Sequence, residues 1–75
     1  MKIKLYYIDN DSCDRPVYKD DIGRLLVDTE PRKSYEPKLC TKLNNAFEGE
    51  PDTPVSYLKD YKNAEFEFVP NRVTW

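Results

Sequence analysis

The chain has 75 residues, enough for one small domain but too few for a deep cleft enclosed by several layers. Its net charge is −2, with 12 basic residues scattered among 14 acidic ones, so no basic cluster favours double-stranded nucleic acid as a partner. It contains no histidine, which excludes histidine-based catalysis and histidine metal ligands.

Six tyrosines, three phenylalanines and one tryptophan can bury enough area to support a folded domain. Surface scaling predicts roughly 4,800 Å² of accessible surface for a folded chain of this size. There is no apolar run of about 18 residues and no signal-peptide pattern, so we expect a cytoplasmic protein without membrane contact. In that compartment Cys13 and Cys40 are expected to be free thiols.

The first part of the chain has the alternation typical of strands. In the first eight residues, MKIKLYYI, apolar or aromatic side chains recur at Ile3, Leu5 and Tyr7. The segment VYKDDIGRLLVD, residues 17–28, indicates a β-hairpin. Its connection contains Gly23, which can adopt the positive φ that a short hairpin loop needs.

The middle segment, PKLCTKLNNAFEG, fits two structures. As a strand it would place Leu39, Thr41 and Leu43 on one face and end in a turn at the two asparagines. As a helix over 37–47 it would bury Leu39, Leu43 and Phe47 on one side. We favour the strand because asparagine and β-branched threonine are poor helix residues.

The last third is expected to contain a loop, a short helix and a strand. EGEPDTP is typical of a loop, and Thr53 could cap a two-turn helix over 54–61 with Pro54 in its first position. AEFEFV, residues 64–69, alternates again and ends at Pro70, as an edge strand allows.

These elements predict a mainly-β fold: a small antiparallel meander or partly open barrel of four or five strands with at most one short helix. The alternative is an α+β fold with a helix at 37–47. The predicted core residues are Ile3, Leu5, Val17, Leu25, Val27, Leu39, Phe66 and Phe68.

The segment from Asp9 to Asp21, DNDSCDRPVYKDD, matches a calcium-binding loop only in part. Asp9 and Asp11 fit positions one and three of an EF-hand, but position five is a cysteine and position six lacks the required glycine. Position twelve is Asp20 in place of a bidentate glutamate. We therefore expect a solvated turn between a strand and a hairpin and no metal ligands.

No other pattern indicates chemistry. The two cysteines lack CxxC spacing, which disfavours a zinc site or a redox site. A phosphate-binding loop is rich in glycine, and the chain has only two glycines. We predict no catalytic residues and no cofactor. A domain this small cannot bury ten aromatic side chains, so some tyrosines and the acidic loop should face a partner. The candidate interaction surface is Tyr6, Tyr18, Tyr35, Tyr57, Glu48, Glu50 and Asp52.

The stretches DRPVYKD, GRLLVD and FEGEPDTP resemble small uncharacterised proteins carried by Gram-positive bacteria and their mobile elements. The resemblance spans residues 11–54 and implies a bacterial, intracellular origin. Those proteins have no assigned activity, so the resemblance implies no function.

We expect from these features a small non-enzymatic module that binds another protein. It would be a monomer or a homodimer paired through strand edges. The alternative is an acidic inhibitor or nucleic-acid mimic of phage or mobile-element type.

Overall fold

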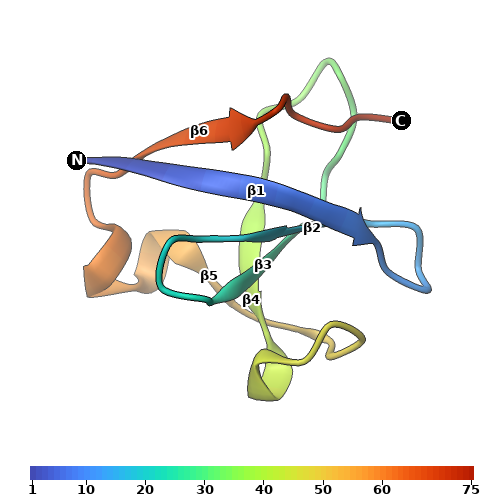
Figure 1. The fold of residues 1–75 in the computed structure, drawn as a ribbon, viewed down its shortest axis with the longest axis horizontal. Coiled ribbons are helices and arrows are strands. Elements are labelled where there is room, and N and C mark those ends of the chain that lie inside the picture. The colour runs from blue at the N-terminus through green and yellow to red at the C-terminus, as the bar shows by residue number, and fades with distance from the viewer.

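The computed structural model describes all 75 residues and contains six strands and three short 3₁₀ turns (Figure 1). None of the helical turns is long enough or apolar enough to cross a membrane. The strands are β1 (Lys2–Asn10), β2 (Pro16–Lys19), β3 (Leu25–Asp28), β4 (Leu39–Lys42), β5 (Pro51–Pro54) and β6 (Glu65–Val69). The turns are η1 (Leu43–Asn45), η2 (Val55–Tyr57) and η3 (Lys59–Tyr61).

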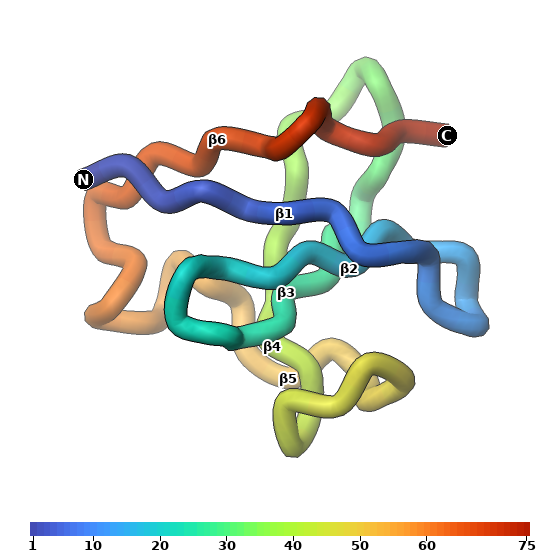
Figure 2. The backbone as a smooth tube through the Cα atoms, viewed as in Figure 1, coloured from blue at the N-terminus to red at the C-terminus, as the bar shows by residue number.

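All six strands form one sheet in the order β5-β4-β3-β2-β1-β6. Strands β1 to β5 form an antiparallel meander, and β6 then returns beside β1, with which it pairs in parallel (Figure 2). The mainly-β prediction is confirmed, and the sheet is mixed and open. The additional strand is β5, in a stretch that was expected to be a loop because it contains two prolines. An edge strand tolerates proline, because the backbone N–H groups on its free side are not needed for hydrogen bonds within the sheet.

The predicted hairpin forms with Val17 opposite Val27 and Tyr18 opposite Leu26. Gly23 has a φ of 88° in its connection, as the sequence predicts for this loop. Both faces of the hairpin are buried: Tyr18 and Leu26 pack into the core, and Val17 and Val27 on the opposite face are fully buried as well.

The core gathers apolar and aromatic side chains from four strands and η3. It comprises Leu5, Tyr18, Leu26, Leu39 and Tyr61, with Ile3, Phe66 and Phe68 packed against it and half-buried. Four of the predicted core residues are fully buried or nearly so, namely Leu5, Val17, Val27 and Leu39.

Leu25 was predicted to be in the core, but its neighbour Leu26 takes that place and Leu25 is half-buried. The reason is that successive side chains of a strand point to opposite faces, and the hairpin turns Tyr18 and Leu26 inward. Val17 and Val27 therefore lie on the opposite face, where they are buried as well.

Residues 39–42 form a strand, so the alternative helix at 37–47 does not occur. The chain turns at Asn44 and Asn45, which have φ angles of 56° and 52° in the left-handed region that asparagine tolerates. Thr53 lies inside β5 and donates its N–H to Thr41 Oγ1 at 3.1 Å, so the expectation that it caps a helix was wrong. The expected helix at 54–61 is instead two turns, η2 and η3, separated by an extended residue.

The folded chain exposes 5057 Å², close to the area expected from its size. Cys13 and Cys40 are both free thiols, as predicted. Burial raises the pKa of the Cys40 thiol.

Candidate functional site

The stretch after β1 contains a buried carboxylate, Asp11, whose four acceptor contacts are all internal. Its Oδ1 accepts the backbone N–H groups of Cys13 and Arg15, each at 3.0 Å. Its Oδ2 accepts hydrogen bonds from Lys42 Nζ at 2.5 Å and from Arg15 Nε at 3.2 Å. The side chains of Lys42 and Asp11 are 0% and 1% exposed. Asp11, which fits the third position of a calcium loop, thus forms an ion pair with Lys42 inside the protein.

Two further buried aspartates organise the next two connections in the same way. Asp20 accepts the N–H groups of Ile22 and Arg24 and, through Oδ2, the hydroxyl of Tyr61 at 2.6 Å. Each carboxylate caps its own loop and also binds a side chain from a distant part of the chain.

At the end of β3, Asp28 accepts the N–H groups of Glu30 and Lys38 through Oδ1. Its Oδ2 lies 3.6 Å from the guanidinium of Arg72, which donates to the carbonyls of Glu30 and Arg32. This contact fastens the C-terminal segment beneath the 29–38 loop.

These three aspartates have a structural role. Their oxygens are directed at turn N–H groups and at Lys42, Tyr61 and Arg72, inside the protein. No group of three or more potential metal-ligating side chains comes together anywhere in the structure.

The Asp11–Lys42 pair predicts loss of stability in acid. Burial alone would raise the pKa of Asp11, but hydrogen bonds from Lys42 and Arg15 and their charges hold the pKa below its ordinary value of 3.8. A lowered pKa stabilises the folded state above the unfolded-state pKa of about 3.9, and this stabilisation is lost as the pH falls through the lower folded-state pKa. We expect urea unfolding to show a steep fall in stability below about pH 4. The fall should be shallower in Asp11→Asn, and an equal slope in both proteins would contradict the assignment.

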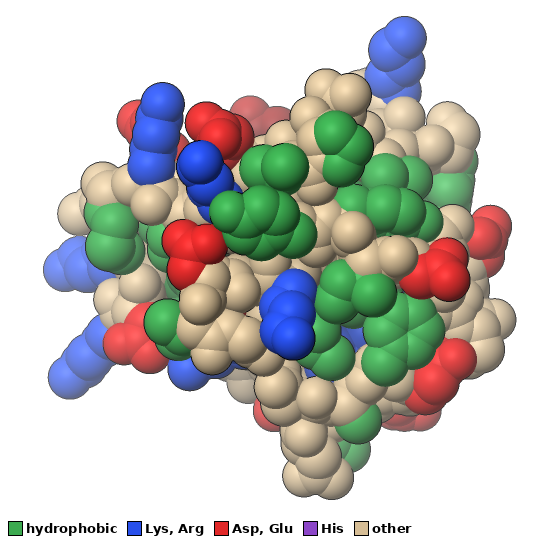
Figure 3. All heavy atoms as spheres, in the orientation of Figure 1, with side chains coloured by type: hydrophobic (Ala, Val, Ile, Leu, Met, Phe, Trp, Pro, Cys, Tyr) green, Lys and Arg blue, Asp and Glu red, His purple; other side chains and the backbone are tan.

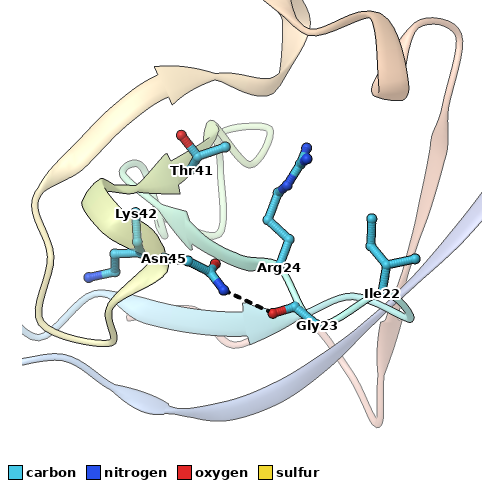
Figure 4. Close-up of a pocket in the computed structure, with 6 residues that line it drawn as sticks. All are labelled: Ile22, Gly23, Arg24, Thr41, Lys42 and Asn45. Atoms are coloured by element: carbon cyan, nitrogen blue, oxygen red, sulfur yellow. Dashed lines mark hydrogen bonds between the residues drawn. The ribbon is translucent and has the colours of Figure 1, made fainter.

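A pocket of about 350 Å³ lies where the β2–β3 connection meets the end of β4 (Figure 4). Asn45 closes one wall, because its side chain donates to Gly23 O at 3.1 Å and accepts from Leu25 N at 2.7 Å. Lys42 lines the pocket but gives its ammonium to Asp11, and Arg24 extends toward Asp60 at 3.5 Å. The polar groups of this pocket are therefore occupied by internal contacts.

The predicted tyrosine surface is not one surface. Tyr6 lies on the outer face of β1, Tyr35 in the loop between β3 and β4, which is at the top of Figure 2, and Tyr57 in η2, which follows β5. All three are exposed, Tyr57 to 80%. Tyr18 is fully buried, so its assignment to the surface was wrong. It faces the core because it lies opposite Leu26, and its hydroxyl accepts the N–H of Val73 at 3.0 Å.

The acidic loop lies at the bottom of Figure 2, apart from the exposed tyrosines. Glu48, Glu50 and Asp52 are exposed. Glu48 accepts the backbone N–H of Ser12 at 2.9 Å, so this carboxylate fastens the loop to the turn after β1. Glu50 and Asp52 have no side-chain hydrogen bond or ion pair and do not line the groove described below.

The concavity with the largest volume is one that the sequence does not predict. It is a groove of about 460 Å³ between β6 and the start of β4 and η2, which we call the open seam. It is lined by Glu36, Pro37, Leu39, Val55, Phe66 and Phe68. The groove exists because the sheet curls until β6 approaches the far side of the meander without pairing with it.

Two phenylalanines form the β6 wall of the open seam and are held from behind by tyrosines. Phe68 packs edge-on against Tyr18 with ring centroids 4.9 Å apart, and Phe66 packs against Tyr61 at 5.9 Å. Tyr18 and Tyr61 are themselves fixed by hydrogen bonds to Val73 and Asp20. The exposed sides of the two phenylalanine rings are therefore rigidly positioned.

The backbone of the same strand is unpaired on the side of the open seam. β6 is a terminal strand of the sheet and pairs only with β1. Glu65 donates its N–H to Met1 O at 2.8 Å, and alternate residues of a parallel strand point to opposite neighbours. The N–H and C=O groups of Phe66 and Phe68 therefore point away from β1, and no backbone hydrogen bond outside the ladders involves them.

The face seen in Figure 3, with β1 and β6 nearest the viewer, carries hydrophobic side chains near its middle with charges of both signs around them. Tyr6 and Ile8 of β1 are exposed to more than 40%. The outer surface next to β6 is thus mixed in character, unlike the apolar open seam.

Comparison with known proteins adds no relative: no family model, curated protein or solved structure matches this chain. The bacterial origin implied by the resemblance noted above stays a prediction.

Proposed function

We propose that this chain is a small non-enzymatic protein-binding module that holds a segment of another protein in the open seam. The observation that carries the proposal is the coincidence, on one strand, of two half-buried phenylalanines and an unpaired backbone edge. Apolar grooves beside free strand edges are a recurring mode of peptide recognition, in which backbone hydrogen bonds give affinity and side-chain pockets give specificity.

The other edge of the sheet is less suited to a partner. β5 contains Pro51 and Pro54, which have no N–H to donate, and it is only four residues long. β6 has five residues without a proline inside it. The two edges therefore differ in a way that favours pairing at β6.

The alternative of an acidic nucleic-acid mimic has less support. A mimic needs carboxylates on its surface at phosphate-like positions, but Asp11, Asp20 and Asp28 are buried and bonded inside the fold. Basic and acidic side chains also mix on the face seen in Figure 3.

A peptide selection tests the proposal. Random peptides displayed on phage are selected against the protein, and the amide resonances shifted by the selected peptides are mapped by ¹⁵N–¹H spectroscopy. We expect shifts at Leu39, Val55, Phe66 and Phe68. Recovery of no binding peptide, or shifts that avoid these residues, would count against the module.

A pair of variants in η2 provides the control. Val55→Arg places a charged side chain in the open seam and should weaken the selected peptides at least about tenfold, whereas Tyr57→Arg changes an exposed residue of the same turn that does not line the seam and should leave binding unchanged. Equal losses in both variants would show that the seam is not the site.

A further inference from the structure

The sequence of β6 and its surroundings also specify the chemistry of the segment that would bind there. The strand reads Glu-Phe-Glu-Phe-Val, and its burial alternates between exposed glutamates and half-buried phenylalanines. A strand added to this edge shares the two faces of the sheet, so each of its residues lies either over the open seam or over the outer face.

Residues of the added strand that lie beside Phe66 and Phe68 face the open seam. That groove is lined mainly by Leu39, Val55 and the two phenylalanines, so these positions require apolar side chains. The unpaired N–H and C=O groups of Phe66 and Phe68 supply the backbone hydrogen bonds.

Residues of the added strand that lie beside Glu65 and Glu67 face outward. Both glutamates are exposed and neither forms an ion pair within 4.0 Å, although Lys2 and Lys4 are their neighbours on β1. Opposite charges at neighbouring positions of a sheet stabilise the pairing, and like charges oppose it. These outward positions therefore favour lysine or arginine.

A second copy of this chain is a poor occupant in the three antiparallel registers centred on the middle residues of β6, Phe66, Glu67 and Phe68. With the two-fold axis at Glu67, that residue faces its own copy; with the axis at Phe66, Glu65 faces Glu67 of the other copy. With the axis at Phe68, Pro70 lies opposite Phe66, where a ladder donor is needed. Both glutamate contacts are repulsive, and the third register lacks a hydrogen bond.

We propose, on the basis of the protein-binding function above, that the open seam and the β6 edge bind an extended segment in which apolar and basic residues alternate. The segment adds to the sheet as a seventh strand. The free protein is accordingly a monomer. The alternation is the same whether the segment runs parallel or antiparallel to β6, because paired residues share a face in both cases.

The test uses two peptides of equal length, one in which valine alternates with lysine and one in which valine alternates with glutamate. Binding to the intact protein is measured by fluorescence anisotropy and mapped by amide shifts. We expect the lysine peptide to bind along β6, with affinity that falls as salt is added, and the glutamate peptide to bind at least about tenfold more weakly. Methylation of alternate peptide nitrogens on the β6 side should abolish binding.

Charge reversal of the strand supplies the decisive comparison. Glu65→Lys/Glu67→Lys should reverse the preference between the two peptides. Glu50→Lys/Asp52→Lys makes the same change in net charge on exposed residues of the acidic loop and should keep the original preference. An unchanged preference in the first variant, or reversal in both, would overturn the proposal, as would a dimer of the free protein in sedimentation equilibrium.

The two proposals fail in different ways. If selected peptides of another composition occupy the open seam while the lysine peptide does not bind, the module stands and the alternating chemistry is wrong. If neither selected nor designed peptides bind the seam, both are wrong.

Discussion

Replacement of Lys42 by methionine is expected to lower the free energy of unfolding by about 3–5 kcal/mol. The substitution keeps the length of the aliphatic stem but leaves the buried carboxylate of Asp11 without its ammonium partner at 2.5 Å. Removal of one member of a buried ion pair leaves an uncompensated charge, which costs more than the pair itself contributes. A chain of this size has only about 4–11 kcal/mol of stability, so a large part of it should be lost.

Urea unfolding followed by tryptophan fluorescence and circular dichroism measures this effect. Lys62→Met, which removes an exposed lysine, serves as the matched control and should change stability by less than about 0.5 kcal/mol. Asp11→Asn/Lys42→Met should be more stable than Lys42→Met alone, because it removes the stranded charge and keeps an acceptor for the turn N–H groups. Wild-type stability in Lys42→Met would show that the pair does not hold the fold.

The location of this pair explains why it matters. It connects the turn after β1 to β4, and the same turn receives Glu48 from the acidic loop at Ser12. Lys42 lies on the same face of the sheet as the buried valines Val17 and Val27, because Val27 pairs with Cys40 and Lys42 follows Cys40 by two residues. The pair therefore holds a second, smaller buried layer on the side of the sheet opposite the main core.

The strands could be predicted from sequence where local alternation decides them. β1, the hairpin and β6 follow from period-two patterns, and the turns follow from Gly23 and the two asparagines. β5 escaped prediction because two prolines are typical of loops, and its place at the sheet edge is a property of the whole topology.

The buried polar contacts could not be predicted because their partners are far apart in the chain. Asp11 and Lys42 are 31 residues apart, and Asp20 and Tyr61 are 41 apart. Aspartate in a turn is a local signal, but lysine is so seldom buried that nothing in KLCTK marks Lys42 as an exception. The burial of Tyr18 could not be predicted for the same reason, because it depends on pairing with Leu26 and on the C-terminal segment, where Val73 donates its N–H to the Tyr18 hydroxyl.

The candidate site was predictable only in part. The alternation of Glu and Phe in AEFEFV indicated an edge strand with one apolar face. It did not indicate that the meander curls to place Leu39 and Val55 across from that face, which creates the open seam. The exposed tyrosines expected to form one surface lie in three separate places because three different loops and strands carry them.

The second large effect is expected at Asp20. Asp20→Ala removes the acceptor of two backbone N–H groups in the hairpin connection and of the Tyr61 hydroxyl, and we expect a loss of about 2–4 kcal/mol. Tyr61→Phe removes only the hydroxyl and keeps the ring against Phe66, so its loss should be about 1 kcal/mol. Urea unfolding of the two variants distinguishes the contribution of the turn from that of the tyrosine contact, and equal losses would contradict the role of Asp20 in the turn.

The contact between Asp20 and Tyr61 also predicts how the stability of the protein changes at alkaline pH, and it connects the hairpin to the open seam. Burial, the hydrogen bond to Asp20 and the negative charge of Asp20 raise the pKa of Tyr61 from its ordinary value of 10.0 to about 12, against a smaller opposing effect of Arg24. A raised folded-state pKa stabilises the protein below the unfolded-state pKa of about 10, and this stabilisation is lost as the pH rises toward 12. Burial also raises the pKa values of Tyr7 and Tyr18, so absorbance titration should show a late-ionising group of tyrosines. That group should contain one tyrosine fewer in Tyr61→Phe, and Tyr61 should ionise at lower pH in Asp20→Asn. Because the Tyr61 ring supports Phe66, peptide binding in the open seam should weaken in Asp20→Ala but persist in Tyr61→Phe; the opposite order would separate the hairpin from the binding site.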